Sequence, residues 1–449
     1  MSEQRYMHLA LVVGDAGFHQ AAWRQAGSGV EQLTSLKLFQ SIAQRAERAV
    51  VDSLFVADVA GFDPQSISAW PSNQLEPLTL LAALAGVTER IGLIGTLSTT
   101  YNAPYTLARQ VLSLDHLSGG RAGWNVVVSR GGQQHYGMAD LPSHSSRYER
   151  AAETLQVARS LWDGWAPDAV VADRQSGVYG RPEKVHVSAF VGAHVNVAGA
   201  LPSPRSPQGR PLIVQAGASE EGRELAARYA DIVFTMQADA QDAAAFYREL
   251  KARAVRHGRR AEDLRVLQGV TPFCAPDLAA ACELQRSLAG LTDHSVGLKR
   301  LGALLNGVDC TALPLDQPLP ESLHAQARQS APSTAATQLL HMIDQQMPLG
   351  DVLQRLLSSR GHWTPVGSFD DIATQLQARF DARQTDGYVV LPAELGASLD
   401  GLLDQVIPRL QAREVLRRSY RGATLREHLD LPLPQWQPPV QGTAKGIIQ

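Results

Sequence analysis

Residues 211–227 (PLIVQAGASEEGRELAA) have the residue types of a site for a negatively charged group. Residues 212–214 form a short apolar run typical of a strand, and a helix rich in Glu, Leu and Ala is expected from Ser219 onward. Gly217 lets the backbone bend closely around a ligand, and a helix N-terminus attracts anions. The alternative is that Ser219 only caps the helix, which is its more common role where the pattern stands alone.

Polar residues also follow the other predicted strands, where a sheet or barrel gathers its functional groups. The candidate site residues are His19, Asp58, Ser98, Thr99, Thr100, Asn125, Arg130, Tyr148, Gly217, Ala218 and Ser219. Hydroxyls, an amide and backbone N–H groups outnumber acids, which suits a phosphate and a polar planar ring better than a metal. Three of these residues have simpler explanations. Asp58 could cap a turn, Asn125 could pair with backbone groups, and His19, expected to be exposed, could be incidental.

Several other classes of chemistry lack the residues they need. The chain has no GxSxG or HExxH motif, no recognisable acid pair, and no GxGxxG after the first predicted strand. Its three cysteines have no metal-binding or disulfide spacing, so no metal and a reducing cytoplasm are expected. The net charge of −3 and the absence of a long apolar stretch argue against nucleic-acid and membrane partners. The chemistry must therefore come from a bound cofactor.

The elements that would position these residues alternate regularly along the 449 residues. Predicted strands cover residues 8–13, 54–57, 91–97, 122–128, 212–216, 232–235, 264–271 and 387–391. Predicted helices cover residues 36–49, 78–87, 104–117, 148–162, 219–229, 241–256, 276–288 and 399–411. Eight strand–helix units predict an α/β fold of the (β/α)₈ TIM-barrel type in a single domain, with a doubly wound open sheet as the alternative.

Three segments fall outside this alternation. Residues 163–209, after the fourth unit, are expected to form an insertion with a β-hairpin. Residues 291–367, after the seventh unit, contain helical runs and are expected to be a lid over the substrate site. The proline-rich residues 431–449 are expected to be an extended tail.

The sequences of several segments closely resemble those of one enzyme family. These segments are 19–24 (HQAAWR), 54–59 (LFVADV), 76–109, 115–129 (DHLSGGRAGWNVVVS), 147–153 (RYERAAE), 206–231, 386–392 (DGYVVLP) and 420–434 (YRGATLREHLDLPLP). They resemble the flavin-dependent monooxygenases of the bacterial-luciferase superfamily, in the branch of nitrilotriacetate monooxygenase component A, dibenzothiophene sulfone monooxygenase and pristinamycin synthase. The resemblance runs in order over most of the chain.

This resemblance implies a TIM barrel that binds reduced FMN (FMNH2), supplied by a separate NAD(P)H:flavin reductase, and uses it with O₂ to oxygenate a small organic substrate. Carried over by position, Asp58 and residues 98–100 lie beside the isoalloxazine ring. Asn125 contacts the polar edge of the ring or the ribityl chain. Tyr148, Ser219 and the amides of residues 217–219 hold the phosphate. A homodimer or homotetramer is expected by analogy.

Substrate is implied to enter near His19, Phe62, Arg130 and the insertion 291–367. Two positions depart from the family pattern, because the usual WNVVTS is WNVVVS at residues 124–129 and Arg130 stands where the alkane enzyme has a histidine. A fixed cation at Arg130 cannot be a general base, but it could bind an anionic substrate. Two alternatives stay open: a deazaflavin-dependent oxidoreductase on the same barrel, and a catalytically impaired flavin-binding protein.

Overall fold

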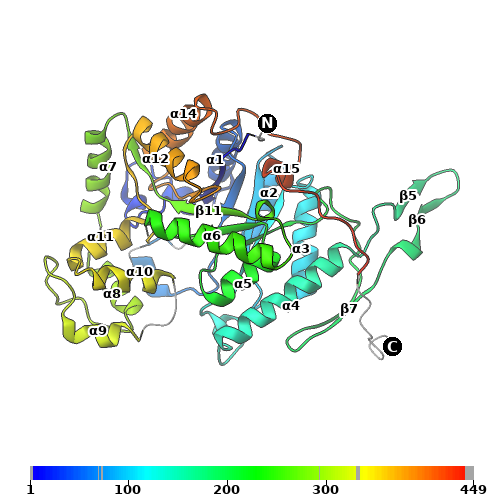
Figure 1. The fold of residues 1–449 in the computed structure, drawn as a ribbon, viewed down its shortest axis with the longest axis horizontal. Helices are drawn as coiled ribbons and strands as arrows, with labels where there is room; N and C mark the ends of the chain where they lie inside the picture. The colour runs from blue at the N-terminus through cyan, green and yellow to red at the C-terminus, as the bar shows by residue number, and fades with distance from the viewer. Residues whose placement is uncertain are drawn as a thin grey trace.

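The computed structural model describes residues 4–68, 70–71, 74–292, 294–329, 334–359 and 361–439. Eight parallel strands form a closed barrel in the order β1-β14-β11-β10-β9-β4-β3-β2 (Figure 1). The strands are β1 (His8–Val13), β2 (Ser53–Val56), β3 (Gly92–Ser98), β4 (Ala122–Val127), β9 (Leu212–Gln215), β10 (Ile232–Thr235), β11 (Arg265–Val270) and β14 (Gly387–Val390). The predicted TIM barrel is confirmed, and each predicted strand overlaps one of these.

Helices surround the barrel because each has an apolar face that packs on the outward-facing side chains of the strands. On β4, for example, Trp124 packs edge-on against Trp162 of α4, with 6.4 Å between ring centroids. The surrounding helices are α1 (Leu36–Arg48), α2 (Pro77–Ala85), α3 (Pro104–Leu117), α4 (His144–Trp162), α5 (Glu220–Tyr229), α6 (Ala240–Arg256), α12 (Phe369–Asp381) and α14 (Ile407–Ala412).

The seventh covering helix differs from the prediction. The predicted helix 276–288 exists as α7 (Leu278–Gly290), but it contacts the small sheet of β12 (Phe273–Ala275) and β13 (Val366–Ser368). The barrel itself is covered there by α12, whose Ile372, Leu376 and Phe380 belong to the same buried cluster as Tyr388 of β14. The sequence prediction was wrong here because it paired β11 with the next helix along the chain.

Two insertions extend from the barrel at opposite ends of the molecule (Figure 1). Between α4 and β9 lie two antiparallel hairpins, one of β5 (Val170–Asp173) with β6 (Val178–Gly180) and one of β7 (Ser188–Val191) with β8 (Asn196–Gly199). Between α7 and β13 lies a helical insertion with its own apolar core. Its helices are α8 (His294–Leu304), α9 (Glu321–Ala327), α10 (Thr334–Asp344) and α11 (Leu349–Ser359). The sequence did not predict α8 or the β5–β6 hairpin.

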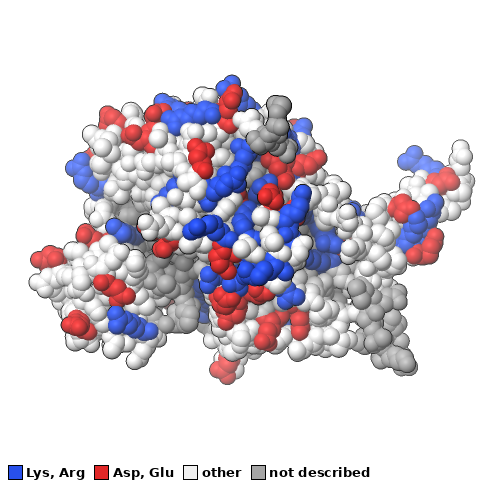
Figure 2. Space-filling model, in the orientation of Figure 1, with Lys and Arg blue, Asp and Glu red and all other residues white. Residues whose placement is uncertain are grey.

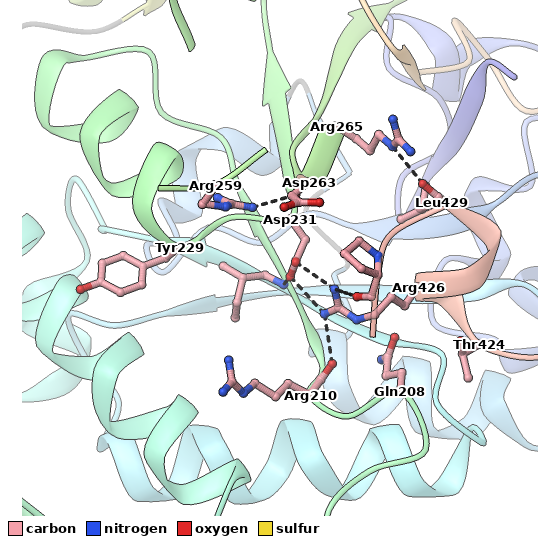
Figure 3. A network of polar contacts seen from close by, with 12 residues as sticks. Gln208, Arg210, Tyr229, Asp231, Arg259, Asp263, Arg265, Thr424, Arg426 and Leu429 are labelled. Carbon is pink, nitrogen blue, oxygen red and sulfur yellow. Dashed lines mark hydrogen bonds and ion pairs between the residues drawn. The ribbon is translucent and has the colours of Figure 1, made fainter. Parts of the chain in front are cut away.

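The end of the barrel where the strands begin is closed by the C-terminal segment around α15 (Leu425–His428). Leu425, Leu429 and Leu431 join the apolar cluster inside the barrel. Arg426 donates to Asp231 at 3.1 Å, and Arg265 donates through Nε to the carbonyl of Leu429 at 2.9 Å (Figure 3). The functional site must therefore lie at the opposite end, where the strands finish.

Beyond Leu431, residues 432–439 have no regular structure, and the rest of the expected tail, 440–449, lies outside the described residues. None of the helices in the described ranges combines the length and the apolar character that crossing a bilayer demands.

Candidate active site

A cavity of about 1640 Å³ opens at the carboxyl ends of the strands, between the barrel and the helical insertion. It is lined by residues that follow β2, β3, β4 and β9, and by residues of α10 and α11. Of the residues predicted from the sequence, those that line it are Asp58, Ser98, Arg130, Tyr148, Gly217, Ala218 and Ser219. The structure therefore brings seven of the eleven candidates to one cavity.

The turn between β9 and α5 has the features of an anion site. A Cβ on Gly217 would clash with Nε2 of Gln215 and lie 2.9 Å from the hydroxyl oxygen of Tyr148, so any larger residue would displace these side chains. The N–H of Gly217 donates to Gln215 Oε1 at 2.8 Å and is therefore already used. Within the described part of the chain, the N–H groups of Ala218 and Ser219 have no hydrogen-bond acceptor. These two amides, at the start of a helix, can accept an external anion.

Ser219 combines both functions that the sequence left open. Its Oγ accepts a hydrogen bond from the N–H of Gly222 at 3.1 Å, so it is the N-cap of α5. The same side chain lines the cavity, and its hydroxyl also hydrogen-bonds the carboxylate of Glu221, from which a bound ligand would have to take the hydrogen. Capping and ligand binding are therefore compatible at this position.

Arg147 is a cavity residue that the list of candidates omitted. Its side chain lies at the start of α4 and is only 8% exposed, and its Nε has no hydrogen-bond partner in the described structure. Burial lowers its pKa, the tyrosines at 101 and 148 oppose this effect, and the positive charge of Arg130 adds to it. The sequence could have indicated Arg147, because it directly precedes Tyr148 and is therefore a cation next to the proposed phosphate site.

The strand ends of β3 and β4 form another part of the cavity wall. Ser98 and Ser129 share a hydrogen bond of 2.7 Å between their hydroxyls. Thr96 lines the cavity, and its hydroxyl accepts from Nδ2 of Asn125 at 2.9 Å. Asn125 is 4% exposed, and its Oδ1 has no partner among the described residues. Asn125 thus lies just beneath the wall, behind Thr96, with an unused polar atom.

Thr99 and Thr100 do not line the cavity, contrary to the expectation that they face a cofactor. Thr99 is fully buried and donates to the carbonyl of Val127 at 3.2 Å. Thr100 Oγ1 accepts from the N–H of Ser129 at 3.2 Å. Both hydroxyls therefore fasten the end of β3 to the end of β4. Only Ser98 of the three faces the cavity.

Asp58 follows β2 at the edge of the cavity. The surrounding protein partly removes its carboxyl from water, which raises its pKa; a hydrogen bond from Val59 opposes the shift, and the negative charge of Glu76 adds to it. A carboxyl of this kind keeps its proton to higher pH than an ordinary aspartate. It can therefore donate a hydrogen bond under conditions where most carboxyls only accept.

His19 does not line the cavity, and the expectation that it is exposed is wrong. Its side chain is 1% exposed and lies edge-on to Phe273, with ring centroids 6.4 Å apart. Nδ1 accepts from the N–H of Ala21 at 3.1 Å, and burial lowers the pKa of the ring to about 4. The glycine-rich loop folds back on Ala393, which explains the burial. Phe62, also expected near substrate, is exposed but does not line the cavity.

The wall opposite the strand ends comes from the helical insertion. It includes His341 of α10, Gln345 directly after α10, Arg355 and Ser358 of α11, and His362, which follows α11. The ring of His362 stacks on Phe234 of β10, with centroids 5.4 Å apart and planes within 5°. The sequence predicted a lid in this segment but indicated none of these residues, because no strand end marks their position.

The residues present fit a flavin phosphate and a polar ring. Two unused amides, the Tyr148 hydroxyl and the Arg147 cation lie at one end of the cavity. Hydroxyls of β3 and β4, with an unpaired amide oxygen behind them, lie at the strand ends. No group of three or more metal-binding side chains occurs in the described part of the chain.

Comparison with known proteins identifies the family of the chain. Residues 16–383 match the family model described as luciferase-like monooxygenase. The chain is 37% identical to N-acetyl-S-(2-succino)cysteine monooxygenase of Bacillus subtilis, over 96% of this chain and 98% of that protein. It is also 37% identical to nitrilotriacetate monooxygenase component A of Aminobacter aminovorans, over 97% of this chain and 98% of that protein.

Solved structures are similar over nearly the whole chain. A riboflavin lyase with modified FMN and riboflavin has a TM-score of 0.83 at 26% identity, covering 97% of this chain and 98% of its own. A long-chain alkane monooxygenase has a TM-score of 0.81 at 26% identity, covering 95% and 96%. A coenzyme F420-dependent reductase matches at 13% identity, so it shares the fold alone and the deazaflavin alternative is weaker. The chain belongs to the luciferase-like monooxygenase family and is a flavin-dependent monooxygenase.

Proposed function

We propose that the flavin is FMN, supplied in reduced form by a separate NAD(P)H:flavin reductase, and that the enzyme uses O₂ to oxygenate a small organic substrate. The observation that carries this proposal is the turn between β9 and α5, where two free amides, Ser219 and Tyr148 surround one glycine. Amides at a helix N-terminus together with hydroxyl donors suit a phosphate monoester. FMN has such a group and riboflavin does not.

In this proposal the phosphate is held by Tyr148, Ser219 and the amides of Ala218 and Ser219. The Gly217 amide is excluded because Gln215 already uses it. Arg147, next to Tyr148, supplies a positive charge in a partly dry environment, where its attraction for phosphate is strong.

Ser98 and Asp58 would hold the ring at the ends of β3 and β4, and Asn125, which donates to Thr96, would support this wall from behind. Reduced flavin supplies the electrons with which O₂ is activated. The chain's residues orient the ring, and the wall formed by α10 and α11 keeps water from the reacting atoms. Asp58, whose pKa is raised by partial burial, supplies a carboxyl near the ring.

The phosphate assignment is tested by the double variant Ser219→Ala/Tyr148→Phe. FMN binding should weaken by roughly 1 to 3 kcal/mol, because hydrogen bonds to a charged group are lost. Titration followed by flavin fluorescence measures the effect. Tyr105→Phe/Ser113→Ala, which removes the same two hydroxyls outside the cavity, is the matched control. Unchanged affinity in the first variant would remove the assignment.

A homodimer or homotetramer is part of the proposal. The hairpin of β5 and β6 projects from the body of the molecule (Figure 1) and exposes Val171, Val178 and Tyr179 by 39%, 44% and 68%. Apolar side chains grouped on a projecting hairpin are typical of contacts between subunits. Over the face shown in Figure 2, the projecting part included, positive and negative residues are intermixed. The expected cytoplasmic location stays a prediction.

A further inference from the structure

The cavity contains arginines that differ in whether they have a counter-ion. Arg223 lies 3.4 Å from Glu220 and 3.8 Å from Glu249 and is therefore neutralised within the protein. Arg130, Arg147 and Arg355 also line the cavity, and no carboxylate in the described ranges forms an ion pair with any of them. These three guanidinium groups are available for an external anion.

The acids on the same wall do not supply the missing counter-ions. Glu76 is the N-cap of α2 and accepts from the N–H groups of Leu78 and Thr79 at 3.1 and 2.7 Å. Asp239 is the N-cap of α6 and accepts from two backbone N–H groups at 2.7 and 3.1 Å. The other acids of the cavity, Asp58, Asp242 and Asp351, form no ion pair with these three arginines in the described ranges. The capping carboxylates are thus satisfied by backbone donors.

The three free arginines come from three different elements around the cavity. Arg147 precedes Tyr148, which is proposed to hold the phosphate. The phosphate would therefore be the counter-ion of Arg147. Arg130 follows β4 on the barrel side, and Arg355 comes from α11 on the insertion side. The cavity volume of about 1640 Å³ leaves ample room for a second molecule beside a flavin. That molecule would lie between the barrel and the insertion.

We propose that the substrate is an organic carboxylate, held by Arg130 and Arg355 from opposite walls of the cavity. This inference rests on the proposed function, because it places the substrate in the space left beside FMN. Arginine presents a planar fork that matches a carboxylate with two parallel hydrogen bonds.

The test uses thiodiacetate, a thioether with two carboxylates, and its uncharged diamide. Isothermal titration measures their binding to the full-length protein with and without oxidised FMN. Thiodiacetate should bind at least about tenfold more tightly than the diamide, because each hydrogen bond to a charged group stabilises the complex strongly. Arg130→Gln and Arg355→Gln should each weaken thiodiacetate binding by about tenfold or more, and Arg130→Lys should weaken it less.

The control is Arg328→Gln, which removes a cation from the same insertion, where it pairs with Asp344 away from the cavity. It should leave thiodiacetate binding unchanged. FMN affinity should stay near the wild-type value in all four variants. Equal binding of acid and diamide, unchanged binding in both glutamine variants, or no binding of thiodiacetate, iminodiacetate or succinate to FMN-loaded protein would each overturn the carboxylate. Failure of the wild type to bind FMN would instead overturn the proposed function alone.

Discussion

In the proposed phosphate site, Gly217 has too little space around it for a side chain unless its neighbours move. Its Cα faces the Tyr148 hydroxyl on one side and the backbone of Gly222, in the first turn of α5, on the other. Any side chain here would push the tyrosine away from the amides that it accompanies. The backbone can therefore come close to the ligand because residue 217 has no Cβ.

We expect Gly217→Ala to weaken FMN binding by about tenfold or more, since its Cβ would lie 2.9 Å from the Tyr148 hydroxyl oxygen and 3.1 Å from the Gly222 Cα. Fluorescence titration with FMN measures this. Gly131 is the matched control, because it lines the same cavity and a Cβ there meets nothing within 4 Å. Equal affinities of Gly217→Ala and Gly131→Ala would show that the turn does not touch the cofactor.

At the scale of elements, the start of α5 has two functions that can be separated. The helix needs an oxygen at position 219 to accept from the N–H of Gly222, and the ligand needs a site free of negative charge. Serine satisfies both requirements. Aspartate satisfies only the first, since it is an equally good N-cap but carries a charge.

Ser219→Asp should therefore keep the thermal stability of the protein within about 1 kcal/mol of the wild type and abolish most FMN binding. Ser219→Ala should do the reverse, losing about 1 kcal/mol of stability while weakening FMN only moderately. Calorimetric unfolding and FMN titration of both variants give the comparison. If Ser219→Asp binds FMN like the wild type, Ser219 is a cap and nothing else.

The elements themselves were largely predictable from the sequence, for a physical reason. A buried parallel strand must be a short apolar run, so β9 to β11 and their flanking helices could be identified from local pattern alone. The sequence could not show that α12, and not α7, covers the barrel there. Which helix covers the barrel depends on the route of the chain through the insertion.

The site residues show the same division. Residues at strand ends, such as Ser98 and Ser219, reach the cavity because the barrel puts them there. His19 and Thr99 could not be placed, because their direction depends on one loop conformation and one hydrogen bond. Arg355 was not predicted because its position depends on how the insertion packs around its own apolar core.

At the scale of the whole molecule, the projecting hairpin should determine the oligomeric state. Val178→Lys/Tyr179→Lys is expected to lower the assembly to a smaller species, because two charges would be placed in an apolar contact. Sedimentation velocity measures the change. Leu117→Lys, at an equally exposed apolar residue on α3, is the control and should not alter the assembly. A wild-type protein that sediments as a monomer would contradict the proposal.

Three buried histidines should make the protein sensitive to acid. Burial lowers the pKa of His19 and of His428 to about 4, and it lowers the pKa of His8 as well. Between the unfolded pKa near 6.5 and the folded value, the unfolded chain binds more protons than the native protein. The free energy of unfolding should therefore fall as the pH drops below about 6.5, by up to about 1.4 kcal/mol per pH unit for each histidine.

Urea unfolding at several pH values between 7 and 5 tests this slope. His428→Gln should make the free energy of unfolding depend less on pH, whatever its effect on stability at pH 7. The variant lacks one side chain that binds a proton more readily in the unfolded chain than in the native protein. His135→Gln should leave the slope as in the wild type, because this ring is exposed in the folded protein. A slope that is the same in all three proteins would contradict the linkage.

The closure of the barrel by Leu425, Leu429 and Leu431 has a consequence for biosynthesis. The strand that completes the cylinder ends at Val390, and the residues that seal its base come a further 35 to 41 positions later. A nascent chain on the ribosome therefore carries the residues proposed to bind phosphate before it has the residues that seal the barrel. We expect cofactor loading to wait until the chain has been synthesised as far as Leu431.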